Sequence, residues 1–230
     1  MFEGFPVVSV PLPSINLHSD LMFHFDDQDP VFYDIFDVRY VLAPADRPMP
    51  EFLTRIWDSP RFAIYEAPTS GAATFATVTV RQSAESKFVL FFANRDWLLG
   101  AAPGAREFIR WSYPASSSVL PSSPTPHCAD GMILGEQVRR ERLAFDVSCD
   151  TASVLVIKQT YHPHWHVTVD GIPASAFMAS PSYIGVDVPP GRHIVVAEYR
   201  TAPWRNALAA TGLATLVGLF IARRYVDFLR

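Results

Sequence analysis

Apolar and polar residues alternate or run together in the second half of the chain in patterns that predict β-strands. The segment LAFDVSC, residues 143–149, alternates apolar with small or polar residues, as a strand with one buried face does. The apolar run VLVI, residues 154–157, is typical of a strand buried on both faces. Several such short segments, separated by turn residues, favour an antiparallel β-sandwich over residues 136–200.

Two turn sequences in this region predict hairpins. Asp170-Gly171 follows the segment HVTV, and an Asp-Gly pair is a strong signal for a two-residue turn. Pro190-Gly191 suits the centre of a type II turn between YIGVDV and RHIVVAEY. Each turn is therefore expected to join two neighbouring antiparallel strands.

The first half of the chain mixes helix and strand patterns. Residues 30–36 predict a short helix, which Asp29 can cap and Pro30 can open. A strand is expected over 38–42, stopped by Pro44. The segment FLTRIWDSPRFAIYEAP, residues 52–68, predicts a hairpin with Asp-Ser-Pro at its bend.

These patterns divide the chain into parts. Residues 1–82 form a smaller N-terminal α+β segment, and residues 83–135 form a connecting region. Within that region 86–99 fits either a strand or a helix, and the Ser/Pro-rich stretch 112–131 predicts a loop. The expected fold is mostly β.

The last part, residues 201–230, is the strongest single signal. Ala207 to Ala222 contains no charged residue, and as a helix these positions are about 24 Å long, against about 30 Å for the bilayer core. Arg223 and Arg224 follow the run, and snorkelling arginines with flanking aromatics can close the gap. A transmembrane helix is favoured over a buried core helix, because the run has no polar face.

Composition and charge agree with a membrane-associated protein. The chain is 49% hydrophobic and only 18% charged, which is less charge than a typical soluble domain carries. Its net charge is −4, and no basic block precedes the final tail, so no nucleic-acid partner is expected. The N-terminus lacks the basic start and long apolar core of a signal peptide.

The two cysteines, Cys128 and Cys149, leave two possibilities open. Outside the cytoplasm they can form a disulfide across an ordinary loop length. Alternatively both are free thiols, because sequence spacing does not fix the geometry that a disulfide needs.

A candidate metal site lies in YHPHWH. In one straight strand His162, His164 and His166 would share a face, which is the arrangement that a zinc site could use. Pro163 lies inside the stretch and favours a bulge or an edge instead. The competing interpretation is a bent, exposed strand entry with Trp165 packed below it.

Two other groups of residues could carry chemistry. Trp111 and Tyr113, beside the Ser/Pro-rich loop, are candidates for stacking on a glycan, although such aromatics are more often core residues. The acidic stretch with Asp26, Asp27 and Asp29 could bind Ca²⁺ or serve acid–base chemistry, or simply be a solvated helix entry. No nucleophile elbow, phosphate loop or dinucleotide fingerprint is present, and no cofactor is expected.

The segment from Thr160 to Arg200 resembles the C-terminal extracytoplasmic module of the YfhO family of bacterial membrane proteins. The family pattern is a strand, Tyr-x-Pro-Gly-Trp, an Asp-Gly turn and a Pro-x-Gly-x-His-type strand before a last transmembrane helix. The matching positions are Tyr161, Pro163, Trp165, Asp170, Gly171, Pro190, Gly191, His193, Val195 and Tyr199. FYDIFDVRYVLAP and RFAIYEAP resemble N-terminal segments of the same family. His164 replaces the usual glycine, and residues 82–135 match poorly.

The resemblance implies a function. YfhO proteins are similar to polytopic glycosyltransferases that use polyprenyl-phosphate-linked sugars, with the catalytic acid in a multi-span region that has no matching position here. The chain is therefore expected to be a noncatalytic part of such a protein, which positions the acceptor or the lipid-linked sugar. It is expected in the bacterial cell membrane, with its bulk extracytoplasmic and its C-terminus cytoplasmic.

Two alternatives stay open. The chain could be an independent membrane-anchored module that binds envelope glycans. It could also be a small zinc-dependent enzyme that uses His162, His164 and His166.

Overall fold

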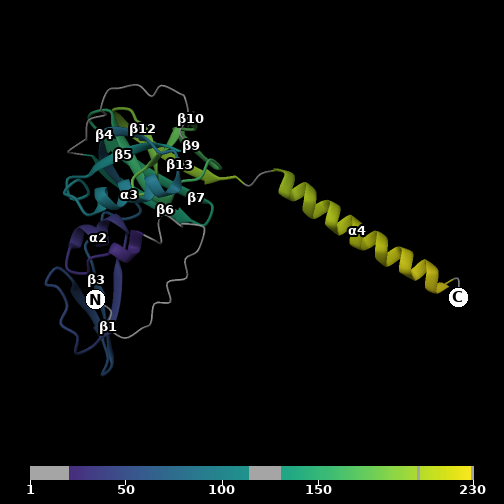
Figure 1. Ribbon diagram of the computed structural model, residues 1–230, viewed down its shortest axis with the longest axis horizontal. Helices are drawn as coiled ribbons and strands as arrows, with labels where there is room; N and C mark the ends of the chain where they lie inside the picture. Colours follow the sequence, from purple (N-terminus) through teal and green to yellow (C-terminus); the bar gives the residue numbers. More distant parts are fainter. Residues whose placement is uncertain (1–20, 114–130, 201–202, 229–230) are drawn as a thin grey trace.

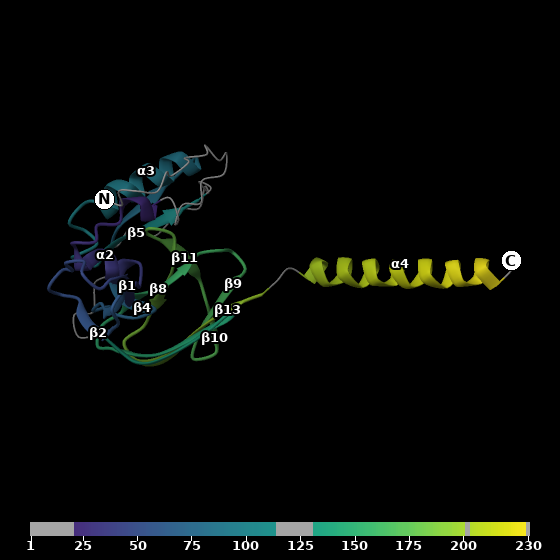
Figure 2. The ribbon, with the colours of Figure 1, turned by 90° about the horizontal axis from the view of Figure 1, so that it is seen from below.

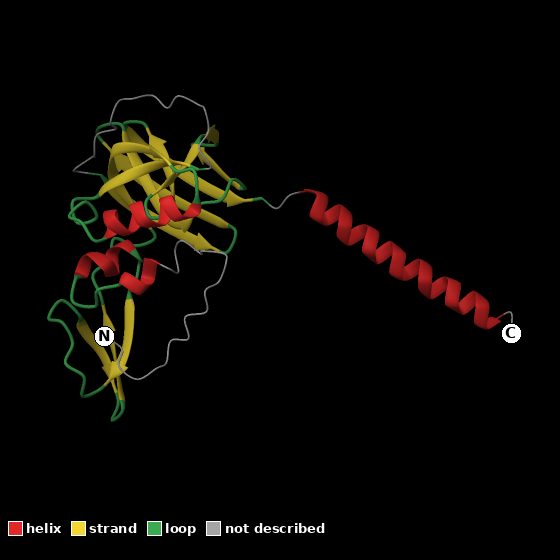
Figure 3. Cartoon of the chain, viewed as in Figure 1, coloured by secondary structure: helices red, strands yellow, loops and turns green. Residues whose placement is uncertain are grey.

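The computed structural model describes residues 21–113, 131–200 and 203–228, without the side chains of Thr79, Val80 and half of the residues of the last segment. It shows a β-rich body with a small sheet at one end and a separate long helix (Figures 1 and 3). The helices are η1 (Met22–His24), α2 (Pro30–Ile35), α3 (Lys87–Leu98) and α4 (Pro203–Phe228). The strands are β1 (Tyr40–Pro44), β2 (Thr54–Asp58), β3 (Phe62–Glu66), β4 (Ala73–Ser83), β5 (Glu107–Ser112), β6 (Met132–Arg139), β7 (Arg142–Cys149), β8 (Ser153–Thr160), β9 (Trp165–Val169), β10 (Ile172–Ala174), β11 (Ala176–Ala179), β12 (Tyr183–Val188) and β13 (Gly191–Tyr199). The prediction of a mostly-β chain is confirmed.

The body consists of two packed β-layers. One is a sheet in the order β10-β9-β13-β7-β6, and the other closes into a barrel in the order β11-β12-β8-β4-β5. Apolar side chains from both layers fill the space between them, among them Phe75, Phe145, Leu155, Val167 and Ile184. A second core lies on the other side of β4 and β8, and α3 and α2 help to enclose it. The run 154–157 is buried throughout, because β8 contributes to both cores.

The region between the two halves is part of this body. Residues 87–98 form a helix, and the Ser86 side chain caps it by accepting a hydrogen bond from the backbone N–H of Val89 at 3.3 Å. The strands before and after α3, β4 and β5, are parallel neighbours, and a parallel pair needs such a crossover. The β-sandwich module expected over 136–200 is therefore not self-contained, since its barrel layer takes two strands from earlier residues.

Of the two expected hairpins one is confirmed and one is wrong. Asp170 and Gly171 both have positive φ, 52° and 79°, and join β9 to β10 as an Asp-Gly turn should. The strands on either side of Pro190-Gly191 lie in different layers, because β12 pairs with β8 and β11 whereas β13 pairs with β7 and β9. This turn carries the chain from one layer to the other.

The N-terminal part folds as a separate three-stranded sheet, β1-β3-β2, under α2. Asp29 caps α2, accepting a hydrogen bond from the backbone N–H of Val31 at 2.9 Å, and β2 and β3 form the expected hairpin. The first strand begins at Tyr40 rather than at Val38. The backbone N–H of Val38 donates a hydrogen bond to the Tyr33 carbonyl at the end of α2, so Val38 is not part of the strand. Tyr33, Leu53 and Tyr65 form the core of this part with neighbouring alanines.

The C-terminal residues form α4, a helix of 26 residues that extends away from the body in two perpendicular views (Figures 1 and 2). Its described large side chains are all at least half exposed: Leu208, Leu213, Leu216, Val217, Leu219 and Phe220. The helix expected here is present. Within the described part of the chain, however, no helix has the length and apolar character needed to cross a membrane.

Candidate functional site

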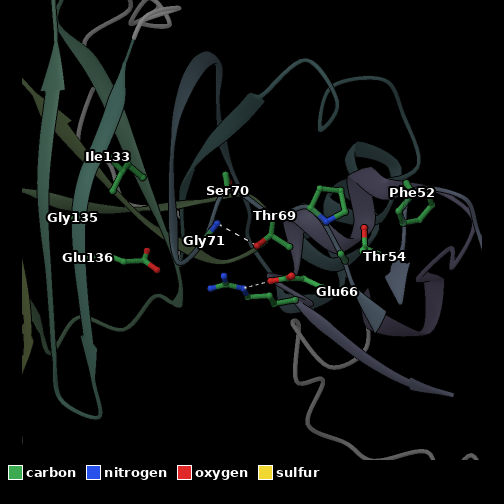
Figure 4. Close-up of a pocket in the computed structure, with 12 residues that line it drawn as sticks. Phe52, Thr54, Glu66, Thr69, Ser70, Gly71, Ile133, Gly135 and Glu136 are labelled. Atoms are coloured by element: carbon green, nitrogen blue, oxygen red, sulfur yellow. Dashed lines mark hydrogen bonds and ion pairs between the residues drawn. The ribbon is translucent and has the colours of Figure 1, made fainter. Parts of the chain in front are cut away.

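A polar cavity of about 500 Å³ lies where the N-terminal sheet meets the body. Figure 4 shows Phe52, Thr54 and Glu66 on one side, and Ile133, Gly135 and Glu136 from β6 on the other. The loop that connects the two halves of the structure passes between them. The complete lining is Arg39, Phe52, Thr54, Glu66, Ala67, Pro68, Thr69, Ser70, Gly71, Ile133, Gly135 and Glu136.

An ion pair forms one wall of this cavity. Glu66 is the last residue of β3, and Arg39 directly precedes β1, its antiparallel neighbour. The Arg39 Nε lies 3.3 Å from the Glu66 Oε1, and the Arg39 carbonyl accepts a hydrogen bond from the backbone N–H of Ala67. The two charges therefore balance each other and hold the end of the sheet against the connecting loop.

The opposite wall presents the carboxylate of Glu136. Its Oε2 accepts a hydrogen bond from the backbone N–H of Ala72 at 3.2 Å. Gly71 has a φ of 82°, and a Cβ built on it would lie only 2.9 Å from that oxygen. A glycine is needed here both for its backbone conformation and to let the carboxylate approach the loop.

The connecting loop is fixed from behind by a buried ion pair. The Ser70 backbone N–H and hydroxyl donate to the Asp34 Oδ1, at 2.6 and 2.8 Å. Lys158 of β8, whose side chain is 2% exposed, places its Nζ 2.9 Å from the same oxygen. Burial raises the pKa of Asp34, but the Lys158 charge and the hydrogen bonds from Ser70 and Lys158 outweigh it and hold that pKa below its usual value. The connecting loop, which lines the cavity, is therefore held in place by Asp34 and Lys158.

The chemistry of the cavity is that of a binding site for a polar ligand. Hydroxyls of Thr54, Thr69 and Ser70 and the carboxylates of Glu66 and Glu136 stand among the apolar surfaces of the other lining residues. Binding sites commonly combine such apolar walls with a few fixed polar groups. The polar side chains of the described lining are hydroxyls, carboxylates and one guanidinium, all of which can form hydrogen bonds with a ligand.

The sequence did not point to these residues as a site. Arg39 and Glu66 lie in the segments VRYVLAP and YEAP, which were interpreted as structural, and Glu136 lies in a region without a motif. Gly71 was the available signal, because an isolated glycine among polar residues often marks a close approach of the backbone to another group.

The three histidines do not form the expected arrangement. Strand β9 begins only at Trp165, so His162 and His164 lie in the preceding turn, where their rings are 4.6 Å apart and a hydrogen bond joins the His164 N–H to the His162 Nδ1. His166 lies in the strand opposite Glu198. Within the described ranges no group of three potential ligands is placed to hold a metal ion.

The structure does not place Trp111 at the surface, where stacking on a glycan would require it. Trp111 is buried, and its indole N–H lies 3.2 Å from the Asn94 Oδ1 and 3.0 Å from the Ser180 hydroxyl. Tyr113 is half-buried and packs against the same cluster as Trp111. The alternation of β5 turns the Trp111 side chain inward, under α3, which a single sequence could not show.

The acidic stretch and Cys149 are structural. Asp29 caps α2, and Asp27 pairs with Arg47 at 2.7 Å, so this stretch is a helix entry. Cys149 is buried in the main core and is disulfide-bonded. Cys128 lies outside the described residues, so the pairing of these two cysteines stays a prediction.

A histidine–carboxylate pair connects the turn between β9 and β10 with the turn between β12 and β13. The His193 Nδ1 lies 2.6 Å from the Asp170 Oδ2, and its Nε2 lies 3.1 Å from the Pro190 carbonyl. The carboxylate and the carbonyl can only accept, so both contacts are hydrogen bonds only when the ring is protonated. The hydrogen bond to Asp170, with that to Pro190, raises the pKa of His193 above its usual value.

This pair predicts a pH dependence. A raised pKa in the folded state stabilises the fold below the ordinary pKa of histidine, and the contribution is lost as the pH rises through the folded value. The melting temperature of the unmodified chain should therefore fall between about pH 6 and about pH 8, and the fall should be smaller in His193→Gln. Equal slopes in both proteins, measured by differential scanning fluorimetry, would contradict the assignment.

Comparison with known proteins assigns no family to the chain. Neither the protein-family models nor the curated proteins nor the solved structures contain a match. The resemblance to the YfhO family therefore stays an expectation from the sequence.

Proposed function

We propose that the chain is a noncatalytic, extracytoplasmic C-terminal portion of a YfhO-like membrane glycosyltransferase of the bacterial cell envelope. Its role is to position an acceptor glycan or a polyprenyl-phosphate-linked sugar beside the catalytic membrane region. In this proposal α4 inserts into the bilayer, the β-rich body lies outside and the C-terminus lies in the cytoplasm. The exposed apolar side chains of α4 are the observation that carries the proposal.

A bilayer is the partner that best fits α4. Its described large apolar side chains are exposed by 50% to 66%, and covering a leucine side chain fully contributes about 1.5–3 kcal/mol. The uncharged run Ala207–Ala222 is shorter than the bilayer core, and the arginines that flank it in the sequence can make up the difference by snorkelling. Arginines next to apolar runs are commonly found in this position.

Two further observations support an extracytoplasmic body. Cys149 is disulfide-bonded, and disulfides persist mainly in oxidising compartments such as the outer side of the bacterial membrane. The polar cavity offers hydroxyls and carboxylates at the surface, which suits a ligand rich in hydroxyl groups.

Membrane insertion is tested by flotation of the full chain with phosphatidylethanolamine–phosphatidylglycerol vesicles. We expect the unmodified protein to float, and the double variant Leu213→Lys, Leu216→Lys to stay in the dense fraction. Two lysines at the centre of an inserted helix cost about 5–7 kcal/mol on the insertion scale, enough to abolish insertion. The matched control is Leu134→Lys, Ile172→Lys, which changes two exposed apolar side chains of the body. Equal flotation of both double variants, or none of the unmodified protein, would contradict the proposal.

A second candidate is an independent membrane-anchored module that binds envelope glycans. It is favoured by the fact that the polar cavity is built entirely from residues of this chain. The two candidates differ in their partner, so purification of the native protein from its own membranes separates them. Co-purification with a polytopic membrane region supports the first, and isolation of the chain without one supports the second.

A further inference from the structure

One face of the N-terminal sheet is apolar and uncovered. In the register of the three strands Leu42 and Trp57 both lie opposite Ile64, and Pro44 lies opposite Phe62. Side chains two apart on a strand share a face, so these residues form one surface with Tyr40. We call it the open face, and its members are Tyr40, Leu42, Pro44, Trp57, Phe62 and Ile64.

The open face is not part of the core. The opposite face of the same sheet packs Ala43, Ala63 and Tyr65 against the apolar core of the N-terminal part. On the open face Tyr40 is 56% exposed, Leu42 66%, Trp57 52% and Phe62 48%. A contiguous exposed apolar surface of this kind usually marks a place of interaction.

The open face is continuous with the polar cavity. Glu66 and Thr54 line the cavity and are paired with each other across β2 and β3, and Tyr40 is the partner of Glu66 on β1. The Arg39 guanidinium, another lining group, lies over the Tyr40 ring at 5.6 Å. From Glu66 to Phe62 the surface extends along β3 for about 14 Å. It thus joins hydrogen-bonding groups at one end to aromatic rings at the other.

We propose that a neutral glycan chain binds along this surface, with one sugar in the polar cavity and the following sugars on the open face. The proposal rests on the proposed function and names the ligand that the module would position. A sugar ring has an apolar face of C–H groups, which stacks on aromatic rings such as those of Trp57 and Tyr40, and a rim of hydroxyls, which pair with groups such as Glu66 and Thr54.

Charge and position favour a glycan over the other occupants of such a surface. The described cavity lining carries one arginine, Arg39, against two carboxylates, Glu66 and Glu136, so it has no excess positive charge for a lipid phosphate or an acidic polymer. Figure 2 shows β1 and β2 on the side of the body opposite α4. With α4 in the bilayer, the strands of the open face would lie on the far side of the body from the lipid.

Affinity electrophoresis of the full chain in detergent tests this proposal, with dextran, mannan and laminarin as the neutral probes and alginate as the acidic probe. We expect at least one neutral polysaccharide to retard the unmodified chain. Trp57→Ala should raise the dissociation constant about tenfold, as loss of a central aromatic contact does. Phe88→Ala is the matched control, because Phe88 is a 64% exposed aromatic residue on α3. Near-ultraviolet circular dichroism should show that both variants are folded.

The outcomes separate this proposal from membrane insertion. Retardation that Trp57→Ala weakens and Phe88→Ala does not supports the glycan surface. No retardation by any neutral probe, retardation by alginate alone, or equal effects of both variants overturns it. Flotation with vesicles should not change in Trp57→Ala. If Trp57→Ala abolished flotation instead, the open face would be a lipid-binding surface.

Discussion

Replacing Asp34 with alanine is expected to lower the free energy of unfolding by about 3–5 kcal/mol. The reason is the ammonium group of Lys158, whose side chain is only 2% exposed and which the change would leave without its carboxylate partner. The backbone carbonyl of residue 34 and the Ser70 hydroxyl would remain as hydrogen-bond partners of the ammonium, at 2.5 and 3.0 Å, but neutral acceptors do not replace the lost charge. Urea denaturation, followed by tryptophan fluorescence, measures the loss directly.

The matched control is the double change Asp34→Ala, Lys158→Met. It removes both charges and keeps most of the lysine's apolar stem, so it should be clearly more stable than Asp34→Ala alone. If the double variant were as unstable as the single one, the loss would come from packing around α2 rather than from an unpaired charge.

The ion pair of Asp34 and Lys158 also makes the stability of the fold depend on pH in the acid range. Because the folded pKa of Asp34 lies below its unfolded value, its contribution is fully present above about pH 4 and is lost as the pH falls through the folded pKa. The Asp34→Asn variant should therefore lose less stability than the unmodified chain between about pH 5 and about pH 3. Since Asp34 also holds Ser70, this variant should weaken glycan binding more than Phe88→Ala does.

Replacing Trp111 with alanine is the second large effect, with an expected loss of about 3–5 kcal/mol. The indole fills the space between β5, β11 and α3, where Leu90 and Met178 contact the same cluster. The cavity left by the ring cannot close without moving strands of the barrel. A thermal melt of the variant in detergent measures the loss as a lower melting temperature.

Trp111→Phe separates the hydrogen bonds from the packing. It keeps a ring but removes the N–H that the buried Asn94 and Ser180 accept from, and leaving buried acceptors without a donor costs about 1–3 kcal/mol. By contrast Trp57→Ala, at an exposed position, should change stability by less than about 0.5 kcal/mol. A stable Trp111→Ala protein that had lost glycan binding would show that Trp111 contacts a ligand after all.

Local signals in the sequence were reliable where a single short stretch decides the structure. The Asp29 cap, the hairpin over 52–68, the Asp170-Gly171 turn and the buried run 154–157 were all present as expected. Each depends on the φ preference, capping group or hydrophobicity of neighbouring residues, so it can be predicted without knowing what packs against it.

The predictions that were wrong or left open depend instead on how distant parts of the chain pack together. Pro190-Gly191 forms a turn, but whether its flanking strands pair depends on β7, β8 and β9, which compete for the same edges. The rings of His162, His164 and His166 would share a face only in a straight strand, and the turn before Trp165 prevents this. Within residues 86–99 the positions 88–93 are all apolar, so this run has no periodicity that distinguishes helix from strand.

The sequence by itself determined that this chain is mostly β, where several of its turns and caps lie, and that its last helix carries no charge over Ala207–Ala222. Only the tertiary structure decided which strands are neighbours, that Trp111 faces inward while Trp57 faces outward, and that Arg39, Glu66 and Glu136 meet in one cavity. The physical reason is that a strand's pattern fixes which side chains share a face. Which of its faces is covered, and by what, depends on segments far apart in the chain, such as Asp34 and Lys158, which are 124 residues apart.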